Sequence, residues 1–190
     1  MLRRRRLLAA LPALAALPWT ARADGDAVAA LRAGGCVLAL RHALAPGTYD
    51  PPDMRLDDCR TQRNLSDEGR AQARRIGESL RARALVPRQV RSSPWCRCRE
   101  TAQLAFGSAE DWRALGSPRA GTETTNAASL AELRAELQRV SARRDGFEAW
   151  VTHMFVLQDL TGSGTASGEG LVLRAGPDGR VQLLGRIVAA

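Results

Sequence analysis

The sequence contains no lysine, so all 28 of its basic residues are arginines. A guanidinium presents a planar fork of donors that matches carboxylate and phosphate oxygens, so this composition favours contacts with oxyanions. The alternative is that the absence of lysine reflects no more than genomic base composition. Histidine is almost absent as well, with only His42 and His153 present.

Long apolar runs are missing after the first 23 residues. Within those residues, four arginines at 3–6 precede an apolar segment at 7–19, and Ala21-Arg22-Ala23 matches a small-residue cleavage pattern. The apolar segment is shorter than the roughly 20 residues of a membrane span. We therefore predict a cleavable signal peptide over 1–23 and a periplasmic or secreted protein with no stable membrane span after cleavage. An uncleaved anchor is the alternative.

Removing this leader changes the charge of the chain. The leader holds five arginines and no acidic residue, so 23 basic residues then stand against 20 acidic ones and the net charge falls from +8 to +3. Such a small excess gives little support for nucleic-acid binding, and we predict no nucleic-acid partner. Residues 24–190 suffice for a single domain with a real core.

The four cysteines all follow the predicted leader, and an exported protein meets an oxidising compartment. Four cysteines allow three complete pairings. We prefer Cys59 with Cys96, since each lies beside or within a candidate site segment, and we expect Cys36 to be a buried thiol. The one-residue spacing between Cys96 and Cys98 is poor for structural zinc, so we predict no metal site.

Hydrophobic periodicity predicts alternating strands and helices. Strands are expected over residues 36–41, 89–93, 111–115, 147–152, 171–174 and 181–188. Helices are expected over residues 66–84, with Ser66 as the N-cap, and over 95–106, 130–140 and 154–160. In the helix at 130–140, Glu132 and Glu136 lie off the apolar stripe and are expected to be solvated. The last two strands, joined by Pro177-Asp178-Gly179, are expected to pair as an antiparallel hairpin. The order of elements predicts a layered α/β fold with a mainly parallel sheet.

Polar residues gather where the predicted strands end. Arg41 and His42 end the first strand, Arg97 lies in the first helical turn after the second, and His153 follows the strand at 147–152. Ligands of α/β sheets bind at the carboxyl ends of strands, so we expect these side chains to meet there. Guanidiniums and imidazoles together suit a tetrahedral phosphoryl group, and a neutral imidazole can attack phosphorus. The loop over 43–58 is expected to overhang this site.

Four motifs, in this order, resemble those of the histidine phosphatase superfamily, the phosphoglycerate mutase-like proteins. They are Arg41-His42-Ala43, Gln62-Arg63-Asn64-Leu65-Ser66, Ser92-Ser93-Pro94 with Arg97 and Glu100-Thr101-Ala102, and Val151-Thr152-His153. The resemblance is greatest to a branch of small exported bacterial proteins, and it implies a three-layer α/β/α sandwich.

The resemblance also implies roles for the residues at the strand ends. His42 would accept the phosphoryl group, Arg41 and Arg97 would hold it, and His153 would form the fourth wall of the pocket. Water would then hydrolyse the phosphohistidine without a metal or cofactor. The implied activity is that of a phosphomonoester hydrolase acting on a small phosphorylated substrate, such as a sugar phosphate or an envelope component.

The chain departs from the family pattern at three places. Ala43 replaces the usual glycine, Met154 follows the second histidine, and Leu115-Gly116-Ser117 supplies no carboxylate where better-known members place a catalytic glutamate.

The missing glutamate leaves the general acid open. The candidates are Glu169, together with Asp50 or Asp53 in the overhanging loop. The alternative function is a catalytically impaired phosphoryl-binding or scaffold domain of the same fold.

Overall fold

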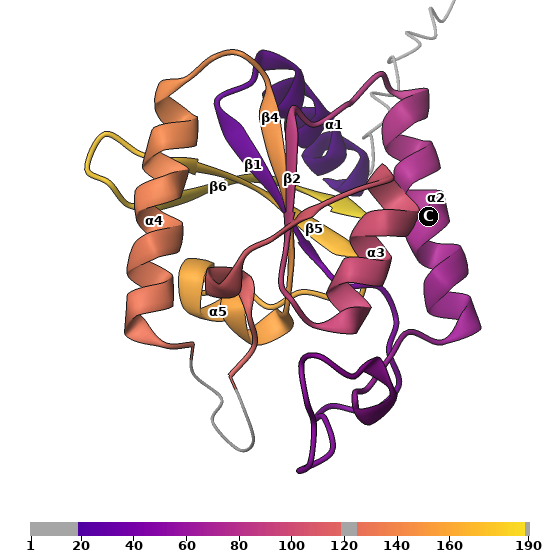
Figure 1. Ribbon diagram of the computed structural model, residues 1–190. Coiled ribbons are helices and arrows are strands. Elements are labelled where there is room, and N and C mark those ends of the chain that lie inside the picture. The colour runs from indigo at the N-terminus through magenta and orange to yellow at the C-terminus, as the bar shows by residue number, and fades with distance from the viewer. Residues whose placement is uncertain (1–18, 119–124, 189–190) are drawn as a thin grey trace, which may run out of the picture.

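The computed structural model describes residues 19–118 and 125–188, which form one sheet with helices on both faces (Figure 1). In these residues the sheet has six strands in the order β3-β2-β4-β1-β5-β6. The strands are β1 Cys36–Arg41, β2 Gln89–Ser92, β3 Glu110–Asp111, β4 Phe147–Thr152, β5 Glu169–Ala175 and β6 Val181–Val188. Strands β1 to β4 run parallel to one another. Strand β5 pairs antiparallel with β1, and β6 pairs antiparallel with β5. The predictions of a mainly parallel sheet and a closing hairpin are therefore confirmed.

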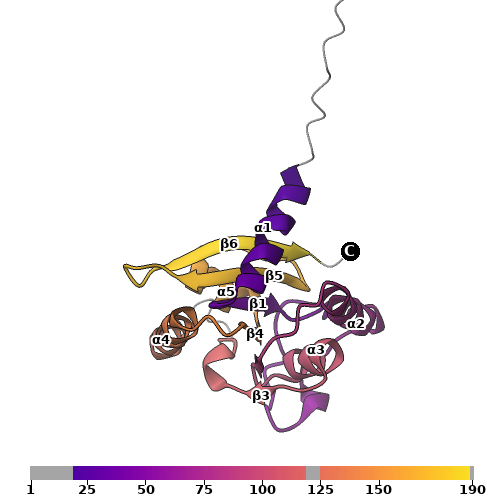
Figure 2. The ribbon, with the colours of Figure 1, turned by 90° about the horizontal axis from the view of Figure 1, so that it is seen from above.

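The helices lie in two layers, as the view from above shows (Figure 2). They are α1 Trp19–Ala33, α2 Asp67–Ala82, α3 Cys96–Phe106, α4 Ala127–Ala142 and α5 Met154–Thr161. Side chains alternate along β1, so Leu38 packs with Ile76 of α2 on one face, while Val37 packs with Leu133 of α4 on the other. Burial on both faces explains why β1 is apolar throughout. The predicted three-layer α/β/α sandwich is confirmed.

The start of α2 is fixed by its own sequence and by the segment after β1. The Ser66 side chain accepts a hydrogen bond from the Gly69 amide, as its predicted N-cap role requires. A Cβ at Gly69 would come within 2.0 Å of the Leu44 carbonyl oxygen, so only glycine allows this approach. The helix thus rests directly on the chain that follows His42.

The secondary structure differs from the sequence prediction at two places. In place of the strand predicted at 111–115, the structure has the two-residue edge strand β3 and then a 3-10 helix over Arg113–Leu115. The strand is short because it pairs only with the last two residues of β2. Helix α1 was not predicted, although Ala27 and Leu31 lie one turn apart and are buried against the sheet.

Residues 1–18 of the predicted signal peptide lie outside the residues that the structure describes. Its cleavage stays a prediction. None of the described helices is long and apolar enough to cross a membrane.

The expectation that Glu136 of α4 is solvated is also wrong. Its side chain is buried and forms ion pairs with Arg91 on β2, at 3.0 Å, and with Arg139 on its own helix, at 2.7 Å. Arg91 in turn approaches the fully buried Glu148 of β4. Helical spacing could not reveal this burial, because the partner arginine comes from a strand 45 residues earlier in the chain.

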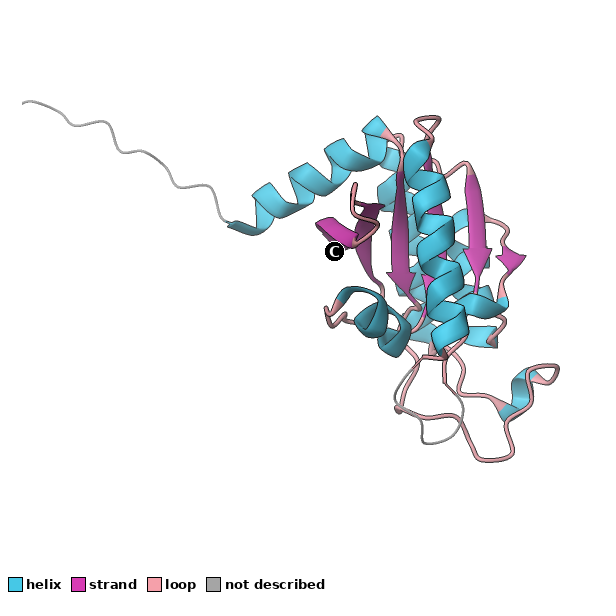
Figure 3. Cartoon of the chain, turned by 90° about the vertical axis from the view of Figure 1, so that its left-hand side faces the viewer, coloured by secondary structure: helices cyan, strands magenta, loops and turns pink. Residues whose placement is uncertain are grey.

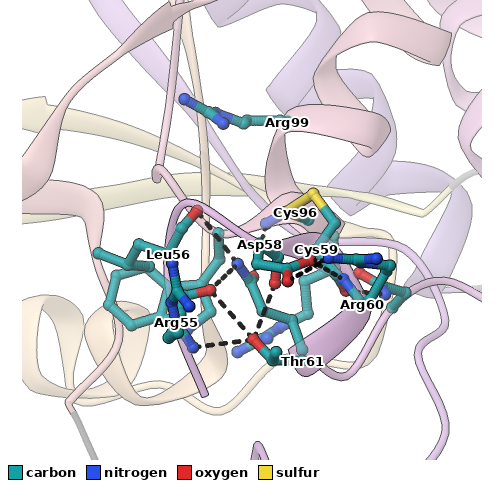
Figure 4. The surroundings of a disulfide bond; sticks show 12 residues. Arg55, Leu56, Asp58, Cys59, Arg60, Thr61, Cys96 and Arg99 are labelled. Atoms are coloured by element: carbon teal, nitrogen blue, oxygen red, sulfur yellow. Dashed lines mark hydrogen bonds and ion pairs between the residues drawn. A yellow bond between two sulfur atoms is a disulfide. The ribbon is translucent and has the colours of Figure 1, made fainter.

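The loop between β1 and α2 projects beyond the carboxyl ends of the parallel strands (Figure 3), and a disulfide ties its far end to α3. The bond joins Cys59, in a 3-10 helix over Cys59–Thr61, to Cys96 at the start of α3 (Figure 4). Gln62 adds a second tie, since it accepts from the Cys96 amide and donates to the Arg55 carbonyl. The preferred cysteine pairing is confirmed, and Cys36 is the predicted buried thiol.

Replacing both Cys59 and Cys96 with serine is expected to lower the free energy of unfolding by about 4 kcal/mol. The disulfide closes a loop of 37 residues, and that closure restricts the unfolded chain. Denaturant unfolding of the oxidised protein measures the difference. The wild-type protein in reductant should match the variant, and the variant should not respond to reductant. Equal stability of the oxidised wild type and the variant would contradict the prediction.

Candidate active site

Parallel pairing of β1 with β4 brings the two histidines together. Arg41 lies opposite Thr152 in the ladder, and the His42 amide donates to the Thr152 carbonyl at 2.9 Å. The residue that follows each of these two strands therefore lies at the same edge of the sheet. The rings of His42 and His153 are 5.5 Å apart between centroids. The expectation that the strand ends meet is confirmed.

The hydrogen bonding of His42 determines which ring nitrogen is free. Its Nδ1 lies 2.7 Å from the Ala43 carbonyl oxygen. A carbonyl can only accept, so Nδ1 carries the proton and Nε2 keeps its lone pair. Burial lowers the pKa of His42 well below its usual value, and the charge of Arg97 lowers it further. The ring is thus a neutral base with one available nitrogen.

His153 is oriented from two sides. Arg97 donates from Nη2 to Nδ1 of His153 at 3.3 Å, so Nε2 carries the proton and donates to the Ser93 hydroxyl at 2.8 Å. The ring also packs edge-on against Trp95, with 5.3 Å between centroids. Burial, followed by the charge of Arg97, lowers the pKa of His153 well below its usual value. Ser93 is a positioning residue that the sequence motif contained but to which we assigned no role.

Arg97 is placed as the sequence predicts, in the first turn of α3, and it is almost fully buried. Besides contacting His153, it donates from Nη1 to both carboxylate oxygens of Asp50, at 2.8 and 3.1 Å. The overhanging loop therefore reaches the site, as expected, through Asp50. The Nε–H of Arg97 has no partner among the described residues.

Arg41 points toward the segment that precedes β5. It donates from Nη1 to the Thr165 carbonyl at 2.6 Å and contacts the sulfur of Met154 at 3.5 Å. Met154, which departs from the family pattern, therefore packs on this arginine. Burial lowers the pKa of Arg41, and the neighbouring Arg97 lowers it further. Its Nε–H, like that of Arg97, has no partner among the described residues.

A third arginine belongs to the site and was not predicted to do so. Arg63 donates to the Ala45 carbonyl at 2.6 Å, and its pKa falls to about 10, first because it is buried and then because Arg97 is close. Its Nε–H is also buried without a partner among the described residues. The available signal was its place in the Gln62–Ser66 motif, but nothing in the spacing showed that it turns toward the strand ends.

The Nε–H groups of these three arginines, which have no partner among the described residues, indicate what the site can bind. A buried donor that lacks an acceptor costs free energy, and native proteins rarely leave one in that state. Arg41, Arg63 and Arg97 each contribute such a donor beside the histidine pair. An oxyanion is the kind of ligand whose oxygens accept from such donors.

The acid candidates occupy different environments. Glu169 starts β5, where its carboxylate pairs with Arg186 at 2.5 Å and accepts from the Ala166 amide at 2.8 Å. Asp53 is exposed. Asp50 accepts from Arg97, from the Trp95 indole at 3.1 Å and from a backbone amide. The structure thus brings Asp50 to the histidine site and engages Glu169 with β6. The acid role of Glu169 stays a prediction.

The two buried histidines are expected to make stability fall as the medium is acidified. In the unfolded chain they take up protons near pH 6.5, whereas burial keeps them neutral to lower pH in the folded protein. The unfolded state then binds more protons, so stability is lost as pH falls through 6.5. Between pH 6.5 and 5 each histidine should contribute a slope of up to about 1.4 kcal/mol per pH unit.

Denaturant unfolding at several pH values measures this slope. Because the chain has only two histidines, His153→Asn should remove about half of the slope in this window, and adding His42→Asn should remove most of the rest. An unchanged slope in the double variant would contradict the assignment.

The fold and the site together define an α/β protein with an arginine-lined oxyanion pocket around two histidines. The family profile described as histidine phosphatase superfamily (branch 1) matches residues 38–147, more than half of the chain. The chain therefore belongs to this superfamily. The matched residues include Arg41, His42, Arg63 and Arg97, whereas His153 lies just beyond them. No curated protein matches the chain.

Solved structures with the same fold include several phosphatases. The protein histidine phosphatase SixA complexed with tungstate shares 15% identity at a TM-score of 0.58, covering 81% of this chain and 97% of that chain. A putative phosphohistidine phosphatase SixA from Agrobacterium tumefaciens shares 23% at 0.52, with coverage of 81% and 97%. The mycobacterial glucosyl-3-phosphoglycerate phosphatase shares 16% at 0.59, with coverage of 80% and 98%. At these identities the likeness concerns the fold.

Proposed function

We propose that this protein is a phosphomonoester hydrolase that works through a phosphohistidine formed on His42. The observation that carries the proposal is the free Nε2 of a neutral, buried His42 beside three guanidiniums with unsatisfied donors. Membership of the histidine phosphatase superfamily supports the same activity.

In the first step, the Nε2 lone pair of His42 would attack phosphorus while the bond to the ester oxygen breaks. The arginines would neutralise charge on the non-bridging oxygens, and His153 would form the wall opposite His42. The departing oxygen takes up a proton and leaves as an alcohol. In the second step, water attacks phosphorus, the P–N bond breaks, the lone pair returns to Nε2, and inorganic phosphate is released.

An alkoxide leaving group needs a proton as the ester bond breaks. Glu169 is the predicted donor, but it would have to release Arg186 before it could deliver a proton. Substrates whose leaving group needs no protonation avoid this requirement. We therefore expect aryl phosphates to be hydrolysed much faster than alkyl phosphates, with a steep dependence of kcat on the pKa of the leaving group.

We further propose that the substrate is a small phosphorylated molecule, either a sugar phosphate or an envelope component. Solved structures with this fold include a phosphoserine phosphatase and the glucosyl-3-phosphoglycerate phosphatase. Trp95, whose ring packs against His153, also lines a pocket of about 1010 Å³ together with Leu56, Pro94 and Gly116.

We also propose that residues 1–23 direct export to the periplasm or beyond and are then removed. Residues 24–190 would remain as a single domain, and the protein would belong to the branch of small exported bacterial proteins. The leader composition supports this. No metal, cofactor or nucleic-acid partner is proposed, and the described residues contain no group of three or more metal-binding side chains.

The alternative is a phosphoryl-binding or scaffold domain without turnover. It is favoured by the engagement of Glu169 with Arg186 and by the absence of a carboxylate at 115–117. Incubation with p-nitrophenyl phosphate, sugar phosphates and a chelator distinguishes the two. Phosphate release that survives the chelator supports the enzyme. Saturable phosphate binding without release supports the scaffold.

A further inference from the structure

Asp50 is a carboxylate placed among groups that would otherwise bind an anion. It follows His42 by eight residues, and its side chain is only 14% exposed. Its oxygens accept from the Arg97 guanidinium, the Trp95 indole and the Arg63 amide at 2.8 to 3.1 Å. The guanidinium, the indole N–H and the backbone amide are all donors of the kind that bind phosphate oxygens.

Asp50 also determines which side of Arg97 stays open. Its carboxylate takes Nη1, and His153 takes Nη2, so the guanidinium cannot rotate without breaking contacts on both sides. The Nε–H is left without a partner among the described residues. Asp50 thus holds Arg97 by a nitrogen other than this free donor.

The formal charges around the histidines follow from this set. Arg41, Arg63 and Arg97 supply three positive charges, and Asp50 supplies one negative charge in contact with Arg97. The nearby carboxylate of Glu169 is paired with Arg186 and adds no net charge. With both imidazoles neutral, the pocket has a formal charge of +2. This value balances the charge of one phosphomonoester dianion.

Building on the proposed phosphatase function, we infer that Asp50 is a specificity-determining residue. Its charge matches the pocket to a single phosphoryl dianion and disfavours more highly charged groups such as diphosphates. The substrate class that follows is a molecule with one terminal phosphomonoester and no second phosphate bonded to it. If Asp50 were purely structural, its replacement would weaken the binding of all anions alike. In the role inferred here, its replacement changes the affinity according to the charge of the anion.

The test compares the dissociation constants of orthophosphate and pyrophosphate by calorimetry. Wild-type protein should bind orthophosphate more tightly. In Asp50→Asn the ratio of the two constants should shift by about tenfold toward pyrophosphate, because one unit of negative charge is removed from a partly buried site. Asp57→Asn makes the same change on the exposed part of the same loop and should leave the ratio unchanged. Asp50→Glu, which keeps the charge, should retain the wild-type ratio.

Two results would overturn the inference. The first is a ratio in Asp50→Asn equal to that of the wild type, whatever the change in absolute affinity. The second is tighter binding of pyrophosphate than orthophosphate by the wild type, which needs no variant to fold. Either result would leave the phosphatase proposal standing. If wild-type protein bound neither anion, both proposals would fail together.

Discussion

Replacing His42 with alanine is expected to lower kcat for an aryl phosphate by at least about 10⁴-fold. The reason is that Nε2 of His42 is the nucleophile in the proposed mechanism, and the second imidazole cannot take its place. Both nitrogens of His153 are engaged, Nδ1 by Arg97 and Nε2 by Ser93. Without His42 no phosphohistidine can form, because His153 is not an equivalent nucleophile.

The measurement combines steady-state turnover with trapping of the phosphoenzyme. Wild-type protein quenched during turnover should carry a phosphoryl group that is labile to acid and stable to alkali, and His42→Ala should carry none. The variant loses a neutral side chain and keeps all three arginines, so it should still bind orthophosphate. Retained binding shows that the fold is intact. Turnover by His42→Ala within tenfold of the wild type would rule out the nucleophile.

Replacing Arg97 with lysine is expected to lower kcat/KM by about 10²- to 10³-fold, even though the charge is kept. The guanidinium donates to Asp50 and to His153 from different nitrogens and still has a free Nε–H. A lysine ammonium is a single point donor on a flexible chain and cannot hold this geometry. The loss should appear in kcat as well as KM, because the orientation of His153 depends on the same side chain.

Arg99→Lys is the matched control for this variant. Arg99 lies two residues along the same helix, is half-exposed and pairs with Asp111 on the surface. Its replacement should leave kcat/KM within about twofold. Because Arg97→Lys disturbs a buried ion pair, its stability should be measured beside its activity. A folded Arg97→Lys protein with kcat/KM close to that of the wild type would contradict the role given to the guanidinium.

The sequence was sufficient for features that depend on local chemistry. An apolar run that ends on Arg41-His42 requires a buried strand with polar residues at its end, and the structure has β1 there. A serine before two acidic residues predicts a helix start, and Ser66 caps α2. The meeting of His42 and His153 also followed from the sequence, because the carboxyl ends of parallel strands share one edge of a sheet.

Other features needed contacts between distant segments, and sequence periodicity does not encode these. Glu136 was expected to be solvated because helical spacing describes one helix at a time, and its burial is due to Arg91 on β2. The strand expected at 111–115 is limited to Glu110–Asp111, because its neighbour β2 ends at Ser92, which pairs with Asp111. In both cases the partner element decided the outcome.

By itself, the sequence determined the layered α/β fold, the strand ends that carry Arg41, His42 and His153, and the helix turn that carries Arg97. Each of these follows from the order of residues over short distances. The tertiary structure alone decided that Arg63 joins the site, that Asp50 binds Arg97, and that Glu169 pairs with Arg186. The physical reason is that the direction of each of these side chains depends on the partner that it contacts, and that partner comes from another part of the chain.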